Sequence, residues 1–455
     1  MRIPFAVGCY RSRSVPLSGQ RLVNAQMQKS PDEDKSPAPV FRTPGIKAFA
    51  SFASNIRGAI RAGGAIIVIA GTSAYSVSEN AVATLLGTIP GADSVRLATS
   101  GTKTVCLANG NGYVIDSAVT QITDGDFVSA TDVAWVDGYF IFLGVGKVFH
   151  SALNDPLTYD ALAYDYPSGS PGSVVSLLIE KRDLIHFKDD SIEVWYNKGT
   201  TPFAFGRAPD GFIDLGCAAP RSPAKLDNSV FWLASDKTVR VLRGATPTRV
   251  STEVIEQAIA SYSTVSDAYG MTISYDGKFS YVLTFPSADV TFEYNIASGE
   301  WNERSSFGLG RWQAQGVVSA WDRTFAWSGV KLGEVSHATY AEWDDPLQVV
   351  MTSKTITAGP IPIPHYRLEV QVEPGVGLVT GQGSNPQIVL RYSDDCQNWS
   401  PEFWRLIGRR GNFGRRAVWA RLGRPITRFY ELAYSEPTPF VFYGAFLNEE
   451  ESLGA

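Results

Sequence analysis

The densest group of side chains that could bind a charged partner is a cluster of arginines late in the chain. Eight arginines fall within the 24 residues 405–428, and they surround the segment Gly408–Gly414, whose glycines predict a loop. Because a guanidinium presents a planar fork of donors that matches carboxylate and phosphate oxygens, this loop could contact DNA phosphates or an acidic partner. The candidate contact residues are Arg409, Arg410, Arg415 and Arg416.

A plainer interpretation of the same cluster stays open. Three aromatic residues, Trp404, Phe413 and Trp419, are interleaved with the arginines. A guanidinium can stack on an aromatic face. The segment can therefore be an exposed, arginine-rich hairpin whose side chains pack on its own aromatic rings and bind no partner.

Carboxylate pairs are the second feature that could perform chemistry. Such pairs occur at Asp189-Asp190, Asp344-Asp345 and Asp394-Asp395. Two carboxylates can act as acid and base in a glycosidase, so a carbohydrate-active enzyme is an alternative function. Asp189-Asp190 falls at the tip of a predicted hairpin, and the other two pairs lie in turn-like contexts. We therefore expect all three pairs to be solvated turn residues.

Metal and nucleophile chemistry have little support in the sequence. The histidines His150, His186, His337 and His365 occur singly, without the spacing of a zinc site. There is no GxSxG motif for a nucleophile elbow and no GxxxxGK[ST] motif for a phosphate-binding loop. We predict that the protein is not an enzyme and has no catalytic, cofactor-binding or metal-binding residues.

Composition narrows the class of protein further. The 455 residues carry a net charge of −5, which argues against tight DNA binding but leaves room for a local basic patch or a DNA duct. The four cysteines are far apart and form no CxxC motif, so we expect reduced and mostly buried thiols. The first residues lack the apolar stretch of a signal peptide, and no segment approaches the length of a membrane span. We expect a soluble protein, synthesised in a cytoplasm.

A repeated hairpin pattern dominates residues 66–337. Short strand, polar turn and short strand recur about seven times, starting at residues 66, 104, 139, 184, 229, 280 and 323. A repeat of about 40–50 residues made of antiparallel strands is the sequence sign of a β-propeller. Asn109-Gly110 and Asp276-Gly277 supply the residues with positive φ that two-residue hairpins need.

The predicted fold is all-β, and it divides into three parts. Residues 1–54 form an extended N-terminal arm, residues 55–345 a β-propeller-like domain, and residues 346–455 a C-terminal β-sandwich or small barrel. The segment Val250–Ser263 interrupts the β pattern and predicts a helix of about ten residues, capped by Ser251 or Thr252. The proline-rich residues 358–364 predict a linker or an edge segment.

Several motifs in the order expected of one family resemble the packaged-DNA-stabilisation, or tail-hub, proteins of short-tailed double-stranded DNA phages. Within residues 190–236, the matching stretches are Ile192–Trp195, Pro202-Phe203, Gly216–Ala219, and Asn228–Leu233 followed by Asp236. Outside that segment, Arg42–Ile46, Arg249–Ile259 and Phe285–Arg304 also match. The resemblance covers most of residues 20–305, and in the last hundred residues it is loose.

The resemblance implies a structural virion protein at the head–tail interface. Such proteins form a hexameric ring, or nozzle, below the portal and adaptor, close the channel to retain packaged DNA, and help to seat the tail needle or plug and the tailspikes or fibres. Double-stranded DNA passes through the channel without sequence-specific binding. A second alternative, besides the carbohydrate-active enzyme, is a β-propeller interaction module that works as a monomer.

Overall fold

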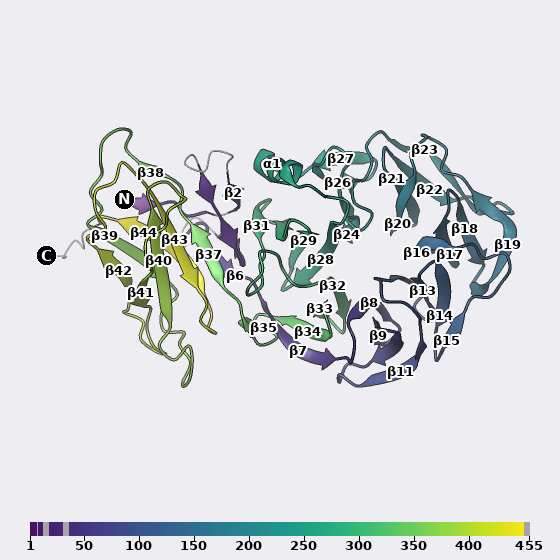
Figure 1. Cartoon of the computed structure of the whole chain (residues 1–455), viewed down its shortest axis with the longest axis horizontal. Coiled ribbons are helices and arrows are strands. Elements are labelled where there is room, and N and C mark those ends of the chain that lie inside the picture. The colour runs from purple at the N-terminus through teal and green to yellow at the C-terminus, as the bar shows by residue number, and fades with distance from the viewer. Residues whose placement is uncertain (7, 12–17, 31–35, 450–455) are drawn as a thin grey trace.

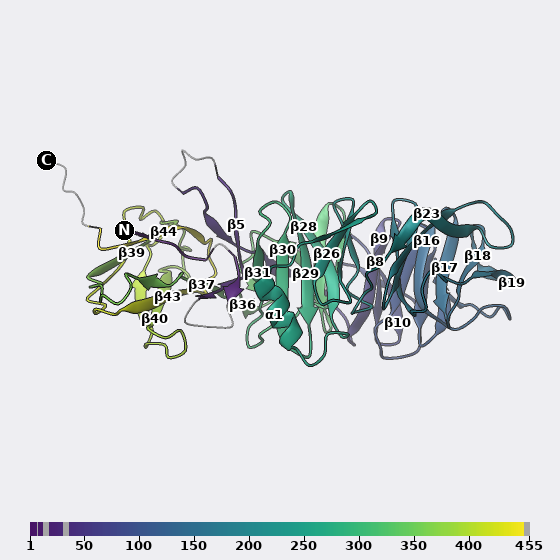
Figure 2. The same cartoon turned by 90° about the horizontal axis from the view of Figure 1, so that it is seen from above.

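The computed structural model describes residues 1–6, 8–11, 18–30 and 36–449, and it consists of two units side by side (Figures 1 and 2). A propeller of four-stranded blades fills one half of the molecule, and a β-sandwich forms the other half. Both ends of the described chain lie at the sandwich, where the amino group of Met1 donates a hydrogen bond to the carbonyl of Leu447 at 2.8 Å.

The described residues form seven blades of four antiparallel strands; blades one to five are separate sheets, and blades six and seven are parts of larger sheets. Blade one consists of β8 (Ile56–Ala62), β9 (Ala65–Ala70), β10 (Ser73–Val77) and β11 (Ala83–Thr88). Blade two consists of β12 (Arg96–Thr99), β13 (Thr104–Ala108), β14 (Asn111–Ile115) and β15 (Val119–Gln121). Blade three consists of β16 (Ala130–Val136), β17 (Tyr139–Gly144), β18 (Val148–Ala152) and β19 (Asp155–Asp165). Blade four consists of β20 (Val174–Glu180), β21 (Asp183–Lys188), β22 (Ile192–Asn197) and β23 (Phe205–Ile213). Blade five consists of β24 (Ala224–Leu226), β25 (Ser229–Leu233), β26 (Val239–Arg243) and β27 (Thr246–Arg249). Blade six consists of β28 (Tyr269–Tyr275), β29 (Lys278–Phe285), β30 (Val290–Asn295) and β31 (Trp301–Glu303). Blade seven consists of β32 (Gly316–Ala320), β33 (Arg323–Ser328), β34 (Lys331–Ser336) and β7 (Gly45–Ser51).

The first strand of each blade faces the propeller axis. β8 contacts both β12 and β32, and further contacts join β12 to β16, β16 to β20, and β24 to β28. Figure 1 shows these first strands around the centre of the ring. The outermost strand of blade seven is β7, which comes from the N-terminal side of the propeller and pairs antiparallel with β34. This pairing closes the ring, because β7 completes the last blade and the chain then continues directly into β8, the first strand of the first blade.

Turn chemistry and apolar alternation explain why the chain folds into hairpins. Asn109 and Gly110 have φ of 50° and 78°, and Asp276 and Gly277 have φ of 46° and 72°, as predicted for two-residue turns. Buried side chains on the two faces of each blade pack against the neighbouring blades; Ile141 and Trp195, for example, belong to one core cluster between blades three and four.

The predicted helix is confirmed as α1 (Glu253–Ser261), which follows blade five. Thr252 is the N-cap residue, and its side chain accepts a hydrogen bond from the amide of Ile255. Val254, Ile255 and Ile259 are buried against the propeller. With nine residues, α1 is the one helix in the described ranges, and it is too short to span a membrane.

The C-terminal unit is a sandwich of two sheets. One sheet contains β42 (Ala417–Ala420), β39 (Arg367–Val372), β44 (Val441–Leu447), β6 (Val40–Arg42), β5 (Ala25–Met27) and β1 (Arg2–Ile3). The other contains β4 (Leu22–Val23), β37 (Val349–Thr352), β43 (Thr427–Tyr434), β40 (Gln387–Ser393), β41 (Phe403–Leu406) and β38 (Ile356–Thr357). One core joins them, and it includes Ile3, Leu22 and Val40 from the N-terminal side of the chain. Residues 358–364 contain no named strand.

The structure distributes residues 1–54 over both units. β1, β4, β5 and β6 belong to the sandwich and β7 to the propeller, while β2 (Tyr10–Arg11) and β3 (Gly19–Gln20) form a separate two-stranded sheet. Residues 31–35, part of the predicted exposed arm, lie outside the described residues. The boundary at residues 54 and 55 therefore does not separate the sheets, and the three-part division stays a prediction.

Strand β4 joins the two units directly, and a second short strand pair extends blade seven toward the sandwich. β4 pairs in parallel with β31 of blade six and antiparallel with β37 of the sandwich, so hydrogen bonds run from one unit into the other. β35 (Ala341–Glu342) pairs in parallel with β7 and antiparallel with β36 (Asp345–Pro346), just before the sandwich begins.

Candidate functional site

The arginine-rich loop predicted from the sequence joins the two sheets of the sandwich. It leaves β41 in one sheet and enters β42 in the other. Ile407 anchors its start, since this side chain is buried and its amide donates to the carbonyl of Pro386 at 3.0 Å. The amide of Gly411 donates to the carbonyl of Gly375 at 3.2 Å, which fixes the tip against a neighbouring loop. The loop is thus held at its base and its tip.

The four candidate arginines lie together on this loop, and all are exposed. Within the described residues, the side chains of Arg409, Arg410 and Arg415 form no hydrogen bond or ion pair. Arg416 lies 3.4 Å from a carboxylate oxygen of Glu369. The loop therefore presents at least three positive charges that its own unit does not neutralise.

Other arginines of the cluster have structural roles. Arg428 is buried, its Nε lies 2.7 Å from an oxygen of Asp394, and its guanidinium lies 4.1 Å from the ring centre of Tyr392. The Nε of Arg405 donates to the carbonyl of Val418 at 2.8 Å. The cluster thus divides into buried or backbone-bound arginines and free ones, a distinction that the sequence did not reveal.

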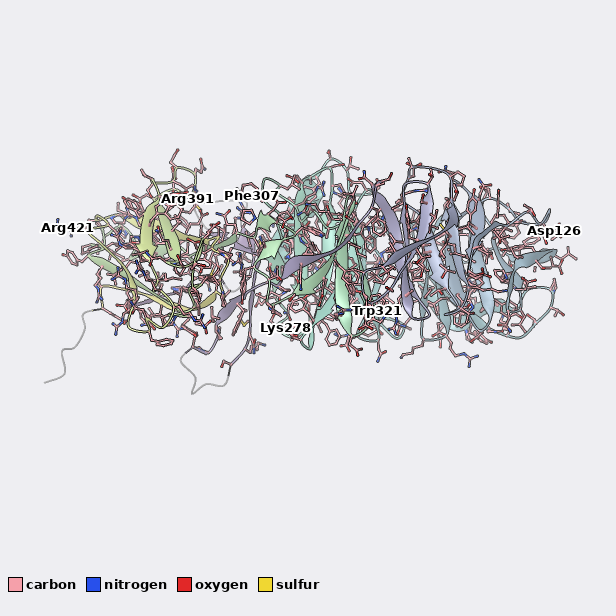
Figure 3. All side chains as sticks on the ribbon, turned by 90° about the horizontal axis from the view of Figure 1, so that it is seen from below. Asp126, Lys278, Phe307, Trp321, Arg391 and Arg421 are labelled. Carbon is pink, nitrogen blue, oxygen red and sulfur yellow. The ribbon has the colours of Figure 1, made fainter. Side chains whose placement is uncertain are left out.

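Exposed aromatic residues accompany the free arginines. Phe413, at the tip of the loop, is 72% exposed and Trp404 is 49% exposed, whereas Trp419 is buried and donates to the carbonyl of Phe403. Arginine and aromatic side chains are enriched among the anchors of protein interfaces. Figure 3 shows Arg421, from the same cluster, at the end of the molecule opposite to Asp126 of the propeller. The loop that carries these exposed arginine and aromatic side chains is a candidate docking surface.

The three carboxylate pairs stabilise turns or lie in solvent. Asp190 accepts hydrogen bonds from the hydroxyls of Ser170 and Ser191, each at 2.8 Å. Asp395 accepts from the amides of Asn398 and Gln397, and these bonds hold the pKa of its carboxyl well below the ordinary value. Asp344 and Asp345 are exposed. The positions of Asp190, Asp344 and Asp395 agree with the expected turns, whereas Asp345 begins strand β36.

The histidines and cysteines are dispersed through the fold. His186 is fully buried against Trp195, and burial lowers its pKa to about 3. Burial and then the charge of Arg428 lower the pKa of His365 to about 4. All four cysteines are free, and three of them are buried. In the described ranges, no group of three or more histidine, cysteine or acidic side chains is arranged to hold a metal ion.

Comparison with known families decides where the chain belongs. The family described as the β-propeller of bacteriophage P22 Gp10 matches residues 1–320, and the family described as the β-sandwich of the same protein matches residues 353–450. The chain belongs to the bacteriophage P22 Gp10 family. It is therefore a structural protein of a phage virion, in the stabilisation family that the sequence motifs indicated, with a β-propeller followed by a β-sandwich.

The solved structures that match this chain are distant from it in sequence. PorZ, a surface component of the type-IX secretion system of Porphyromonas gingivalis, is 14% identical, with a TM-score of 0.39 over 80% of this chain and 46% of that chain. The extracellular domain of the putative one component system BT4673 from B. thetaiotaomicron is 8% identical, with a TM-score of 0.43 over 88% of this chain and 59% of that chain. This chain thus spans about half of each. No curated protein matches the sequence.

Proposed function

We propose that this protein is a tail hub, one subunit of a hexameric ring that lies below the portal and its adaptor, closes the channel and retains packaged DNA. The observation that carries the proposal is the match of both structural units, residues 1–320 and 353–450, to one phage stabilisation protein. In this role the ring also holds the tail needle or plug and the tailspikes or fibres at the head–tail interface of the virion.

The joined units suit a ring subunit. A closed ring of identical subunits uses a heterologous contact, in which one face of each subunit binds a different face of its neighbour. A body with a propeller at one end and a sandwich at the other offers such unlike faces, and strand β4 connects them by backbone pairing. A connection of this kind transmits load, because the units cannot swing apart without breaking hydrogen bonds.

The loop that carries Arg409, Arg410, Arg415 and Arg416 is the proposed docking element. The guanidinium groups of Arg409, Arg410 and Arg415 can bind carboxylates on an adjoining virion protein or phosphates of the DNA terminus. The net charge of −5 limits general attraction to DNA, so DNA can leave through the channel when the virion ejects it. A local basic loop on an acidic protein can dock on a partner without attracting DNA strongly along the whole channel.

A DNA-retention assay tests this function. DNA-filled heads that carry portal and adaptor but lack this protein are incubated with nuclease, with or without the purified chain. We expect the DNA to become digestible without the protein and to stay protected with it, whereas an unrelated acidic protein gives no protection. Equal digestion in the presence and absence of the chain would contradict the proposed role.

A further inference from the structure

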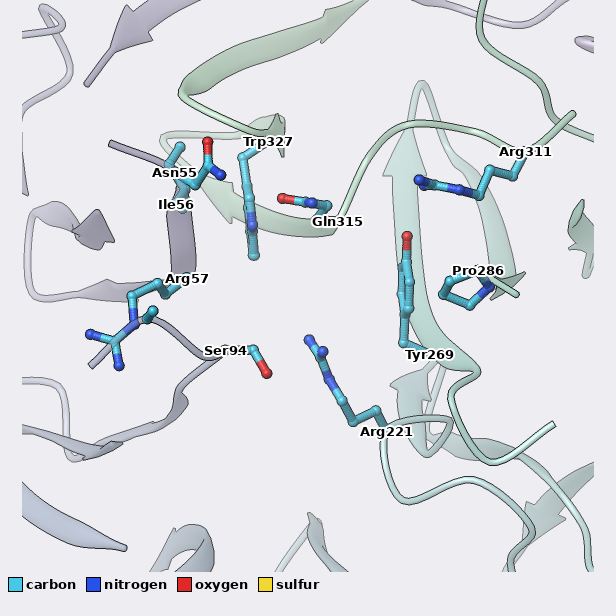
Figure 4. A pocket seen from close by; sticks show the side chains of 11 residues that line it. Asn55, Ile56, Arg57, Ser94, Arg221, Tyr269, Pro286, Arg311, Gln315 and Trp327 are labelled. Atoms are coloured by element: carbon cyan, nitrogen blue, oxygen red, sulfur yellow. The ribbon is translucent and has the colours of Figure 1, made fainter. Parts of the chain in front are cut away.

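A cavity of about 290 Å³ opens at one end of the propeller axis (Figure 4). Its lining comes from the starts of the axial strands β8 and β28, from the segments that lead into β12, β24 and β32, and from the ends of β29 and β33. Five of the seven blades therefore contribute to one pocket. The volume lies at the lower end of the range typical of small-molecule sites, about 300–1,000 Å³.

The lining is basic and lacks any acidic residue. Arg57, Arg221 and Arg311 are its charged members, and Tyr269, Gln315 and Trp327 contribute polar and aromatic surface. Arg57 is buried, and its guanidinium donates to the backbone carbonyls of Asp93, Gly71, Ile89 and Pro90. It contributes positive charge beside the pocket, but its donors are occupied.

Arg221 is the arginine that is free to bind. Its side chain points into the pocket in Figure 4, and its guanidinium lies 5.7 Å from the ring centre of Tyr269. Among the described residues, no side chain or backbone group forms a hydrogen bond or an ion pair with this guanidinium. Burial and then the charge of Arg96 lower the pKa of Arg221. Arg96 itself is paired with Asp132 at 3.6 Å.

Arg311 approaches the same space from a different loop. Figure 4 shows it reaching into the pocket on the other side of Tyr269 from Arg221. Its Nε lies 3.6 Å from an oxygen of Asp289, a half-exposed carboxylate that also accepts from the amide of Gly310 at 2.7 Å. Arg311 is thus only loosely paired with Asp289, and its guanidinium also contacts the side chain of the buried Tyr269. When the guanidinium turns toward an anion, the Tyr269 hydroxyl keeps its hydrogen bond to the carbonyl of Ala314 at 3.0 Å.

We propose that this axial pocket binds a small organic anion, whose carboxylate or phosphate binds Arg221 and is attracted by the charge of Arg311 across Tyr269. The guanidinium fork of Arg221 supplies paired donors to the oxygens, and Gln315 and the ring of Trp327 contact the uncharged body of the ligand. The pocket lacks a carboxylate that could act as acid or base, so the expected outcome is binding without turnover. The proposal does not depend on the hub role, because the site is formed within one subunit.

Isothermal titration of the full chain tests this site with four probes: inorganic phosphate, glucose 6-phosphate, glucuronate and neutral glucose. We expect saturable binding of at least one anion and none of glucose. Arg221→Gln and Arg311→Gln should each weaken that binding at least tenfold, while Arg182→Gln, at an exposed turn of blade four, should leave it unchanged.

Thermal unfolding of each variant establishes that it is folded. Arg221→Lys retains the charge but loses the guanidinium fork, so it should bind the anion with intermediate strength. Saturable binding of none of the three anions would overturn the proposal. Undiminished binding by both folded glutamine variants would also overturn it, because the anion would then bind elsewhere.

Discussion

Arg21 and Glu303 form a two-pronged ion pair although 282 residues separate them in the chain. The Nε and Nη2 of Arg21 both donate to the carboxylate of Glu303, the latter at 2.6 Å. Cys9 donates to the same carboxylate at 3.1 Å. The N-terminal segment is therefore attached to the last strand of blade six by side chains as well as by the pairing of β4 with β31.

This pair predicts a loss of stability in acid. Burial alone would raise the pKa of Glu303, but the charge and hydrogen bonds of Arg21, with that of Cys9, outweigh it and hold the pKa below its ordinary value. A carboxyl whose pKa is lower in the folded state stabilises the fold fully above its unfolded pKa, about 4.3, and this stabilisation is lost as the pH falls through the folded value.

The corresponding variant is Glu303→Gln. We expect it to lower the free energy of unfolding by about 1–3 kcal/mol at pH 7, because the bonds to a charged group are lost. It should also reduce the dependence of stability on pH in the acid range. Urea unfolding of the wild type, this variant and the exposed control Glu402→Gln, each at several pH values, measures both effects. Identical acid sensitivity of the wild type and Glu303→Gln would exclude this role for the pair.

Gln26 provides a second test of how the units are joined. This buried side chain of β5 donates to Glu293 of blade six at 2.6 Å and accepts from the hydroxyl of Tyr275 at 3.0 Å. Gln26→Ala leaves both partners without this bond in a buried place, so we expect a loss of about 1–3 kcal/mol. Gln28→Ala, two residues away and exposed, should change stability little. Equal unfolding curves for the two variants would contradict this assignment.

Arg42 tests the connection between the propeller and the sandwich. It is buried, and its guanidinium donates to the carbonyls of Glu436 at 2.7 Å and Tyr340 at 2.9 Å, and also to that of Leu347. Arg42→Met preserves length and apolar bulk but leaves several buried carbonyls unpaired, each costing about 1–3 kcal/mol. We expect a fall of at least about 2 kcal/mol, which chemical unfolding can measure. A fall no larger than that of the exposed control Arg61→Met would refute the prediction.

The docking loop is tested by charge reversal. Changing Arg409, Arg410, Arg415 and Arg416 together to Glu should leave the fold intact, because these side chains are exposed, and should impair attachment to heads or DNA retention. The control reverses four exposed charges on the propeller: Lys181, Arg182, Arg207 and Arg243. Sedimentation of head complexes and plaque counts provide the readout. Normal infectious particles from the loop variant would remove the loop from the docking mechanism.

Local signals were sufficient to predict the hairpins and the helix. The turn residues Asn109-Gly110 and the capped segment after Ser251 carry their structure in a few neighbouring positions, and both predictions are confirmed. The sandwich strands β1, β4 and β5 have only two or three residues each, too few for a periodic pattern to identify. Their positions depend on partners hundreds of residues away, as with Arg2 opposite Phe446.

The candidate sites show the same limit. The arginine cluster was visible in the sequence, but only the fold shows that Arg428 is buried beside Asp394 while Arg409 remains free. The axial pocket was not predicted. Arg221 and Arg311 are 90 positions apart in the chain and line the same pocket only because the ring of blades brings their loops to one end of the axis. A sequence pattern indicates structure that neighbouring residues determine, whereas this pocket forms only when the propeller closes.

The most direct test of the hub proposal is electron microscopy of the full chain, alone and after mixing with DNA-filled heads that carry portal and adaptor. The account predicts a ring of six subunits below the portal on heads that keep their DNA, whether or not the ring exists beforehand in solution. A protein that remains monomeric and never attaches to the heads would contradict the account, and would favour a propeller module that works alone.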